Sequence, residues 1–385
     1  MPLPPLASAD GELGDADVRR HAHQLILPQI GAAGQRRLKN SRVLVIGADE
    51  VGAPVLAHLA DAGVGVLGIA DGSPLHAWDR CFGQPAFGTA EATRVSRAAA
   101  WETALRTTHP SVTTEVHETR LGVANAASVI SQYDVVLTAS EDPAVCCLVD
   151  DVCVRLGKPF IWGEIDASKG RTSVFWDVHG PTYRDLYPSP PTPYFRGMAG
   201  VLKTLGGWLA VSMAMETAKL LTGMGDPLIG RMMEYDAMGA LCQVVPVARH
   251  HATKRSAELT AAEPYCGLLS PEAAEAARES TISAEELKEL LDSEVPICLV
   301  DVREPDEHAF SDILGSTLIP KGEFFGGDAV ARLPQDQKIV LFCRMGIRSA
   351  EALAVVKRAG HSDAFHLGGG IIAWAQQVDS SMPTY

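Results

Sequence analysis

The sequence has 385 residues, enough for two or three domains that each bury a hydrophobic core. Hydrophobic residues make up 46% and charged residues 21%, a composition typical of folded globular proteins and not of disordered chains. The formal net charge of −14 opposes binding to nucleic acid, and no apolar run reaches the roughly 18 to 20 residues that span a bilayer. The acidic start lacks the pattern of a signal peptide, so we expect a cytoplasmic protein with neither nucleic-acid nor membrane partners.

Alternating apolar segments in the first half predict a layered α/β domain. A β-branched run at residues 42–46 ends at Gly47, and an apolar-periodic helix is expected over 51–62. Strands that alternate with helices form mostly parallel sheets. We therefore predict a Rossmann-like, mostly parallel sheet with helices on both faces. The further predicted strands cover residues 66–70, 134–137, 159–163 and 172–176.

The segment that follows is less regular. Proline-rich residues 180–200 predict a long crossover loop, and an apolar helix is expected over 205–223. A closing β-hairpin is predicted from 232–235 and 241–247, and the stretch beyond it is polar, rich in Ala and Glu, and poor in large apolar residues. The chain is therefore divided into an N-terminal domain (1–250), a linker (251–280) and a small α/β domain (281–385).

The C-terminal domain contains a cysteine at the head of a predicted helix. In KIVLFCRMGIRSAEAL, a strand over 338–342 ends at Cys343, Gly346 permits a tight loop, and Ser349 is expected to cap a helix that reaches residue 359. Loop N–H groups, the positive end of the helix and two arginines favour a thiolate and then a persulfide anion. The alternative is an unreactive buried cysteine at a strand end. The predicted catalytic residues are Cys343, Arg344 and Arg348, and the other persulfide-loop residues are Met345, Gly346, Ile347 and Ser349.

Three segments of this domain resemble the rhodanese family. CRMGIRS (343–349) resembles the active-site loop, and DVREPDEH (301–308) and HLGGGIIAW (366–374) resemble the two flanking signatures. Phosphatases of the same fold have five residues between their Cys and Arg, whereas four separate Cys343 from Arg348, so the resemblance favours sulfur transfer over phosphate chemistry. It also implies that Asp301 and Arg303 are structural. The alternative for these two is a solvated ion pair at a strand end.

The N-terminal domain has a glycine turn, GADEVG (47–52), followed by Asp71, and this is the outline of a nucleotide-binding βαβ unit. HQLILPQIGAAGQRRLKNSRVLVIG, LAHLADAGVGVLGIADGSP and GRMMEYDAMG resemble the adenylyltransferases that activate sulfur-carrier proteins for molybdopterin and thiamine synthesis, which are relatives of ubiquitin-activating enzymes. Followed by a rhodanese domain, the chain resembles two-domain adenylyltransferase/sulfurtransferases. These convert the C-terminal glycine of a carrier to a thiocarboxylate.

The resemblance implies a site for ATP and Mg²⁺, but several positions differ from the family. Asp49 and Glu50 replace two glycines of the turn, and each like-charge contact with a phosphate costs about 4 kcal/mol at about 4 Å and an effective dielectric near 20. His23 replaces an arginine, and WDRCFGQ (78–84) replaces a phosphate-binding stretch. We therefore expect an impaired ATP site. The residues that the resemblance assigns to ATP and Mg²⁺ are Gly47, Gly52, Asp71, Arg94 and Glu141.

The family's structural zinc is expected to be lost, and no other metal site is predicted. Two Cys-x-x-Cys pairs form such a site, and only one of the four aligned positions is a cysteine here. Arg196 aligns with the cysteine that some relatives link covalently to the carrier. Cys343 is therefore expected to carry the sulfur. The four positions aligned with the zinc ligands are Thr182, Asp185, Glu263 and Cys266.

Three functions remain open at this point. The first is a sulfurtransferase that delivers persulfide sulfur from Cys343 to a ubiquitin-like carrier with a Gly-Gly tail, with the N-terminal domain as a docking or dimerisation scaffold. The second is a bifunctional, ATP-dependent adenylyltransferase/sulfurtransferase. The third is a carrier-binding module without catalysis. The resemblance also implies a homodimer and a persulfide donor such as a cysteine desulfurase. The helix at 202–221 is a candidate dimer contact, and burial in the core of its own chain is the alternative for this helix.

Overall fold

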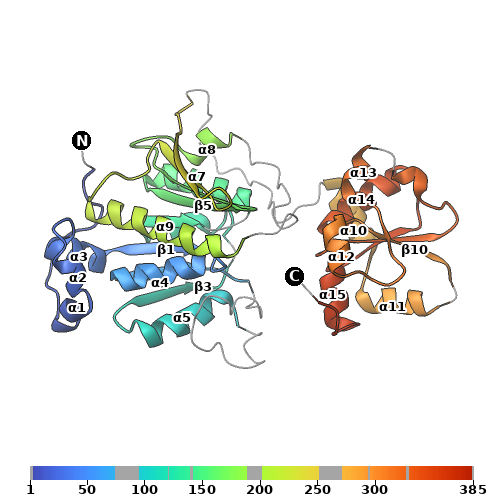
Figure 1. Ribbon diagram of the computed structural model, residues 1–385, viewed down its shortest axis with the longest axis horizontal. Helices are drawn as coiled ribbons and strands as arrows, with labels where there is room; N and C mark the ends of the chain where they lie inside the picture. Colours follow the sequence, from blue (N-terminus) through green and yellow to red (C-terminus); the bar gives the residue numbers. More distant parts are fainter. Residues whose placement is uncertain are drawn as a thin grey trace. The chain divides into compact units, whose positions relative to one another are not determined.

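The computed structural model describes residues 3–73, 95–119, 121–138, 142–188, 202–250, 271–293, 295–326 and 329–383. The chain divides into two units, residues 1–265 and 266–385 (Figure 1). Each unit has its own sheet and its own buried hydrophobic clusters. Within the described ranges, no helix is both long and apolar enough to cross a bilayer.

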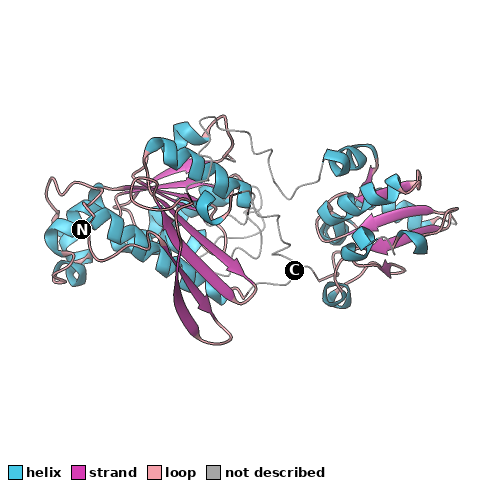
Figure 2. Ribbon diagram, turned by 90° about the horizontal axis from the view of Figure 1, so that it is seen from above, coloured by secondary structure: helices cyan, strands magenta, loops and turns pink. Residues whose placement is uncertain are grey.

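The N-terminal unit is built on an eight-stranded sheet with the order β3-β2-β1-β4-β5-β6-β7-β8. The strands from β3 to β5 pair in parallel, and β6, β7 and β8 continue the sheet in antiparallel pairings, drawn in magenta in Figure 2. The predicted mostly parallel sheet is confirmed, and the predicted hairpin extends this sheet as β7 and β8. The strands are β1 (Arg42–Ile46), β2 (Val66–Ala70), β3 (Thr113–His117), β4 (Val135–Thr138), β5 (Phe160–Asp166), β6 (Lys169–Phe175), β7 (Arg231–Asp236) and β8 (Leu241–Pro246).

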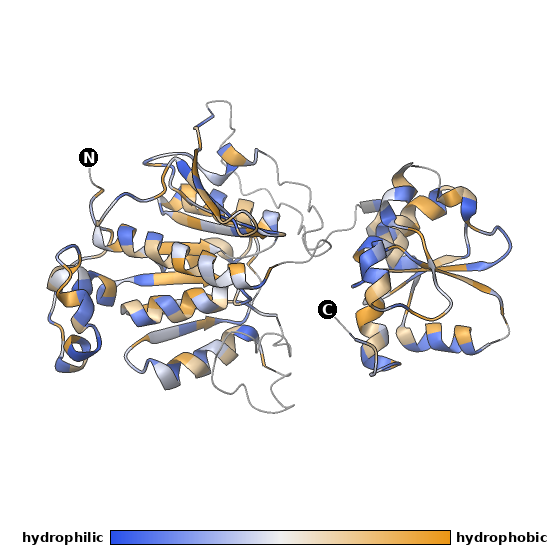
Figure 3. Cartoon of the chain, in the orientation of Figure 1, coloured by the Kyte–Doolittle hydropathy of each residue, from blue (hydrophilic) through white to orange (hydrophobic). Residues whose placement is uncertain are grey.

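Alternate residues of the central strands face two different helical layers, as the two-residue repeat of a strand requires. In β1, Val43 and Val45 belong to one hydrophobic cluster, and Leu44 and Ile46 belong to the other. Figure 3 shows hydrophobic and hydrophilic stretches side by side on the covering helices. Helices α1 (Asp15–Arg20) and α2 (Ala22–Leu25) lead into α3. The first cluster includes α3 (Gly31–Asn40), α4 (Gly52–Ala62), α5 (Arg97–Thr108) and α9 (Thr204–Thr222), and the second includes α6 (Ala126–Ile130), α7 (Pro143–Leu156) and α8 (Tyr183–Leu186).

Strand β3 has no counterpart among the predicted strands. Its residues, TTEVH, are exposed or half-buried at the edge of the sheet and form no apolar run. A pattern-based prediction depends on apolar side chains that face the core. An edge strand that leaves most of its side chains partly exposed therefore gives a weak signal.

The C-terminal unit has a five-stranded parallel sheet with the order β11-β10-β12-β13-β9. Hydrophobic clusters lie on both of its faces, which confirms the predicted small α/β fold. The strands are β9 (Thr281–Ile282), β10 (Ile297–Asp301), β11 (Thr317–Leu318), β12 (Lys338–Phe342) and β13 (Ala364–Leu367). The helices are α10 (Pro271–Glu279), α11 (Ala284–Asp292), α12 (Pro305–Phe310), α13 (Lys321–Gly326), α14 (Ile347–Arg358) and α15 (Gly370–Gln377).

Helix α10 lies inside the segment predicted to be a linker. It packs against α14 and buries Ala273, Ala276 and Ala277. Alanines permit a close helix contact but carry little apolar surface, so a search for large apolar residues does not detect such a helix. The described part of residues 251–280 therefore belongs to the C-terminal unit.

Candidate active site

The sulfur of Cys343 lies at the head of a twelve-residue helix. Strand β12 ends at Phe342, and Gly346, with a φ of 94°, turns the chain into α14. The backbone N–H of Gly346 donates to the Cys343 Sγ at 3.1 Å, and the Ser349 hydroxyl lies 3.6 Å from the same sulfur. Two hydrogen-bond donors and the positive end of α14 favour a negative charge on this sulfur.

Ser349 is not the helix cap that the sequence predicts. Gly346 takes the N-cap position, because its left-handed backbone turns the chain directly into the helix, and α14 already begins at Ile347. Ser349 lies in the first turn, where its hydroxyl is 3.0 Å from the Gly346 carbonyl. The hydroxyl donates to that carbonyl and lies 3.6 Å from the Cys343 sulfur, so it does not act as a cap.

Arg348 takes part in an ion pair that the sequence does not predict. Its Nη1 and Nη2 donate to the two carboxylate oxygens of Glu307 at 2.6 and 2.7 Å, and both side chains are buried. The expectation that Arg348 stabilises the sulfur anion as a neighbouring cation needs correction, since Glu307 balances its charge. Arg344 is half-buried, and Met345 is the most exposed residue of the loop.

Within the first flanking signature (301–308), other residues hold Glu307 in place. Arg303 binds the Asp301 carboxylate and donates to the backbone carbonyls of Glu307 and Ser311. The His308 ring also contacts Asp301, at 2.9 Å. Asp301 and Arg303 are 0% exposed, so the alternative of a solvated ion pair is wrong. The geometry agrees with the structural role that the resemblance implies for them.

The second flanking signature (366–374) contacts the backbone of the loop that carries Cys343. The N–H of Ile371, in the first turn of α15, donates to the Cys343 carbonyl at 2.8 Å. A Cβ on Gly370 would lie 2.3 Å from that carbonyl oxygen, and Gly370 has a φ of 59°. Glycine is therefore required for this close approach. The run of three glycines in the sequence is the signal that marks this contact.

A histidine that was not predicted as a site residue lies behind Ser349. The Nδ1 of His366 is 3.4 Å from the Ser349 hydroxyl, and its Nε2 is 2.8 Å from the Thr281 hydroxyl. Burial lowers the pKa of His366 to about 4, although a hydrogen bond with the Gly346 backbone opposes that shift. The imidazole is therefore neutral at physiological pH.

The glycine turn of the N-terminal unit adopts the tight conformation expected of a nucleotide-binding βαβ unit. Gly47 has a φ of 87°, and a Cβ on Gly52 would lie 1.8 Å from the Gly47 carbonyl oxygen. The structure thus brings these two predicted residues together. The turn leads from β1 directly into α4, whose first N–H groups are the ones that bind phosphate in such folds.

In this chain the carboxylate of Asp49 accepts hydrogen bonds from N–H groups at the start of α4. Its Oδ1 accepts the backbone N–H of Val51 at 3.2 Å and that of Gly52 at 3.4 Å. A phosphate and this carboxylate compete for the same donors and repel each other. A nucleotide triphosphate can therefore use these donors only after the Asp49 side chain has left them.

Asp71, to which the resemblance assigns the ribose, is also held by the protein. Its carboxylate accepts the N–H of Ala48 at 2.9 Å and that of Ser73 at 2.8 Å, and Arg97 lies 3.8 Å away. Asp71 is 7% exposed. Its observed contacts hold the glycine turn in place.

Of the remaining positions that the resemblance singles out, some lie in the described residues and others lie outside them. Thr182 and Asp185 form a capping box at the start of α8, and among the described residues no group of three or more His, Cys, Asp or Glu is arranged to hold a metal ion. Asp142, which follows the predicted Mg²⁺ ligand, caps α7. The positions outside the described residues are 78–84, Arg94, Glu141, Arg196, Glu263 and Cys266.

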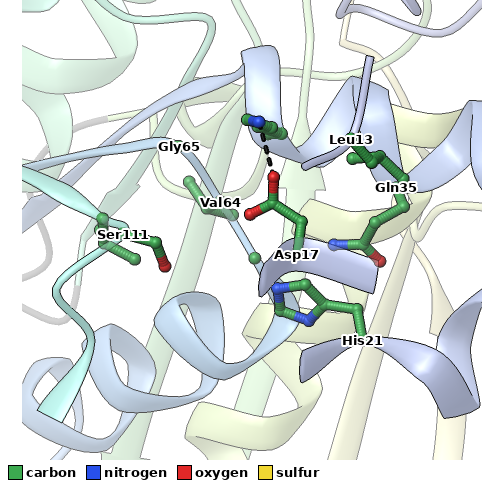
Figure 4. A pocket seen from close by; sticks show the side chains of 10 residues that line it. Leu13, Asp17, His21, Gln35, Val64, Gly65 and Ser111 are labelled. Atoms are coloured by element: carbon green, nitrogen blue, oxygen red, sulfur yellow. Dashed lines mark hydrogen bonds and ion pairs between the residues drawn. The ribbon is translucent and has the colours of Figure 1, made fainter. Parts of the chain in front are cut away.

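Figure 4 shows a small cavity elsewhere in the N-terminal unit, with a volume of about 20 Å³. Its lining includes Gly65 and Val112, which directly precede β2 and β3. Nucleotides bind at the carboxyl ends of parallel strands, whereas this cavity lies at the amino ends. The cavity is therefore separate from the glycine turn, and its volume is enough for a water molecule.

Comparison with known proteins identifies relatives for both units. Residues 21–257 match the ThiF family, and residues 283–377 match the rhodanese-like domain. The "Probable adenylyltransferase/sulfurtransferase MoeZ" of Mycobacterium tuberculosis (strain ATCC 25618 / H37Rv) is 42% identical over 393 residues, covering 100% of this chain and 99% of that protein. "Adenylyltransferase and sulfurtransferase MOCS3" of Drosophila ananassae is 30% identical over 404 residues, covering 97% and 87%.

Solved structures with a similar fold include E. coli MccB with ATP, with a TM-score of 0.51, 14% identity, and coverage of 64% of this chain and 75% of that one. PaaA has a TM-score of 0.53, 15% identity, and coverage of 62% and 85%. At these identities the likeness concerns the fold alone.

Proposed function

Because this chain belongs to the ThiF family and carries a C-terminal rhodanese-like domain, we propose that it is an enzyme that transfers sulfur from a persulfide on Cys343 to the C-terminal glycine of a ubiquitin-like carrier protein. One observation carries the sulfur-transfer half of this proposal. The Cys343 sulfur accepts the Gly346 N–H and faces the Ser349 hydroxyl at the head of α14, which suits a sulfur anion.

The chemistry requires an activated carboxyl group on the carrier. The outer sulfur of the persulfide attacks the carbonyl carbon of an acyl-adenylate, and AMP leaves. The product is an acyl disulfide with Cys343. A thiol then attacks the Cys343 sulfur, the carrier thiocarboxylate leaves, and a second thiol reduces the mixed disulfide that remains on Cys343. The loop contributes by holding the persulfide as an anion, the nucleophilic form of sulfur.

Two forms of the function differ in where the acyl-adenylate is made. The relatives named adenylyltransferase/sulfurtransferase match this chain over its whole length, and this supports a bifunctional enzyme that makes the adenylate itself with ATP and Mg²⁺. We therefore place the bifunctional form first. The second form, in which the N-terminal unit is a docking or dimerisation scaffold, is favoured by the contacts of Asp49 with the first N–H groups of α4.

Sulfur transfer from thiosulfate to cyanide tests the shared half. We expect activity in the wild-type protein and in Cys242→Ala, whose cysteine is exposed, and none in Cys343→Ala. Mass spectrometry of the protein after treatment with a persulfide donor is expected to show one added sulfur atom on Cys343. Absence of both results would leave the third function, a carrier-binding module without catalysis.

Exchange between ATP and pyrophosphate, measured with an added ubiquitin-like carrier ending in Gly-Gly, separates the two forms. Exchange supports the bifunctional enzyme. Sulfur transfer without exchange supports the scaffold. A cysteine desulfurase is the proposed class of persulfide donor, and loading of Cys343 by such an enzyme and free cysteine tests that assignment.

A homodimer is the proposed assembly. Helix α9 exposes Val211 and Met215, which are 47% and 49% accessible in the single chain, and contact with a second copy would cover them. Light scattering coupled to gel filtration is expected to give the mass of a dimer. Val211→Glu is expected to shift the mass toward that of a monomer.

A further inference from the structure

Helix α10 lies outside the segment that matches the rhodanese-like domain, yet it packs in the unit that carries Cys343. The match covers residues 283–377, whereas α10 spans Pro271–Glu279. The helix packs against α14, whose head lies at the Cys343 sulfur. The family match therefore does not account for α10.

The face of α10 that meets α14 consists of small side chains. Ala273, Ala276 and Ala277 recur at the three- and four-residue spacing of one helix face, and all three are buried. Ala276 shares a hydrophobic cluster with Ala352 of α14 and with Cys343. Alanine side chains let two helices approach closely, so a larger side chain at this face must push the helices apart.

The start of α10 is joined to the far end of α14. Glu272, in the first turn of α10, forms an ion pair with Arg358, the last residue of α14. Both side chains are exposed, so the pair contributes little stability, but it fixes the direction of the contact. Helix α10 begins beside the end of α14 and runs back toward its head.

The other end of α10 reaches the residues behind the head of α14. The Thr281 hydroxyl donates to the Ala277 carbonyl in the last turn of α10 and lies 2.8 Å from the Nε2 of His366. The Nδ1 of His366 is 3.4 Å from the Ser349 hydroxyl, in the first turn of α14. Thr281 and His366 are paired in register on β9 and β13, so the sheet itself sets their contact. The last turn of α10 is thus held to the strand behind the active-site loop.

We propose that α10 is a functional part of the sulfur-transfer unit, and that Ala276 and Thr281 are positioning residues that keep the head of α14 against the Cys343 sulfur. Ala276 acts through α14, and Thr281 acts through its contacts at the end of α10. The Gly346 N–H and the positive end of α14 stabilise an anion on the sulfur only while the helix keeps its place. The inference rests on the proposed function, in which Cys343 reacts as a sulfur anion.

The test measures how fast iodoacetamide alkylates Cys343 in the full-length protein across a range of pH, followed by mass spectrometry of the peptide that contains Cys343. Ala276→Leu pushes α10 away from α14, whereas Glu275→Leu places the same side chain on the exposed face of α10. Thr281→Val removes the hydroxyl and keeps the shape of the side chain, whereas Thr281→Ser keeps the hydroxyl. Hydrogen exchange of the β10 peptide shows whether each variant is folded.

We expect Ala276→Leu and Thr281→Val each to slow alkylation at neutral pH about threefold, and to raise the pH of half-maximal rate by about half a unit, since one unit corresponds to a tenfold change in ionisation. Glu275→Leu and Thr281→Ser are expected to keep the wild-type profile. A change that only lowers the stability of the unit leaves the pH of half-maximal alkylation in the folded protein unchanged. This readout therefore separates positioning from packing.

A wild-type profile in Thr281→Val, or in a folded Ala276→Leu, would show that α10 only covers α14, and the inference would be wrong. Equal shifts in the control variants would also overturn it. If Ala276→Leu unfolds the unit, which fast exchange in β10 would reveal, the two Thr281 variants decide the question. Alkylation needs neither a sulfur donor nor ATP. A protein that shows the expected profiles but transfers no sulfur would therefore contradict the proposed function while supporting the role of α10.

Discussion

Arg348 and Glu307 form a buried, doubly hydrogen-bonded ion pair that joins the active-site loop to the first turns of α12. The two contacts are 2.6 and 2.7 Å, and the residues are 41 positions apart in the chain. Arg303 holds the Glu307 backbone from the other side. The loop that carries Cys343 is thus fixed by charges that belong to the first flanking signature.

Glu307→Gln is expected to destabilise the C-terminal unit and to lower sulfur transfer. The change leaves the Arg348 charge buried without a carboxylate, which costs about 3 kcal/mol, and it loosens the loop. Hydrogen exchange of the β12 and α14 peptides measures the stability, and the thiosulfate assay measures the activity. Asp292→Asn, in an exposed pair with Lys288, is the control and is expected to change stability by less than about 0.5 kcal/mol. Equal effects of the two variants would contradict the prediction.

Gly370→Ala is expected to abolish most of the sulfur transfer. Its Cβ would collide with the Cys343 carbonyl oxygen at 2.3 Å, so the loop must shift, at a cost of about 2 kcal/mol or more. Gly360→Ala is the matched control, because Gly360 also has a positive φ, of 103°, but a Cβ on this residue would meet no atom within 4 Å. The control is expected to lose about 1 kcal/mol of stability and to keep its activity. A fully active Gly370→Ala would show that the close approach is not needed.

Asp49→Ala is expected to lower stability and to strengthen nucleotide binding. The side chain satisfies two N–H groups at the start of α4, and loss of such a cap costs about 1 kcal/mol. The same N–H groups then become accessible to phosphate. Calorimetry with Mg-ATP is expected to show tighter binding than in the wild type. Ser283→Ala removes a comparable cap from α11 and should leave ATP binding unchanged.

The stability of the C-terminal unit is expected to fall as the pH is lowered because of His366. Its pKa is lowered from 6.5 to about 4 in the folded protein, so the unfolded chain binds the proton more readily. The stability that this group contributes is complete above pH 6.5 and is lost as pH falls toward 4, by up to about 3 kcal/mol.

Hydrogen exchange of the β12 and β13 peptides as a function of pH measures this dependence. His366→Gln is expected to flatten the slope between pH 6.5 and 4, whereas His23→Gln, at an exposed position, should leave it unchanged. A slope that is the same in wild type and His366→Gln would assign the acid sensitivity to other groups.

Local patterns in the amino-acid sequence were enough to define most of the elements and to single out Cys343 as the candidate reactive residue. The apolar run ending at Phe342, the glycine at 346 and the following helical pattern are local features, and they place Cys343 at a helix head before any tertiary contact is known. The same is true of Gly47 and Gly52, whose turn requires only residues close to each other in the chain. Helix α10 was missed because its buried face consists of alanines, which carry little hydrophobic signal.

The surroundings of the sulfur could be established only from the folded chain. Arg348 pairs with Glu307, Ser349 faces His366, and His366 contacts Thr281, which lies 85 positions away. Side-chain spacing in a sequence fixes which residues share one helix or strand, but it does not define which strands become neighbours. The charge balance at Cys343 depends on that neighbourhood. Likewise, only the folded turn shows that the Asp49 carboxylate accepts a backbone N–H at the start of α4.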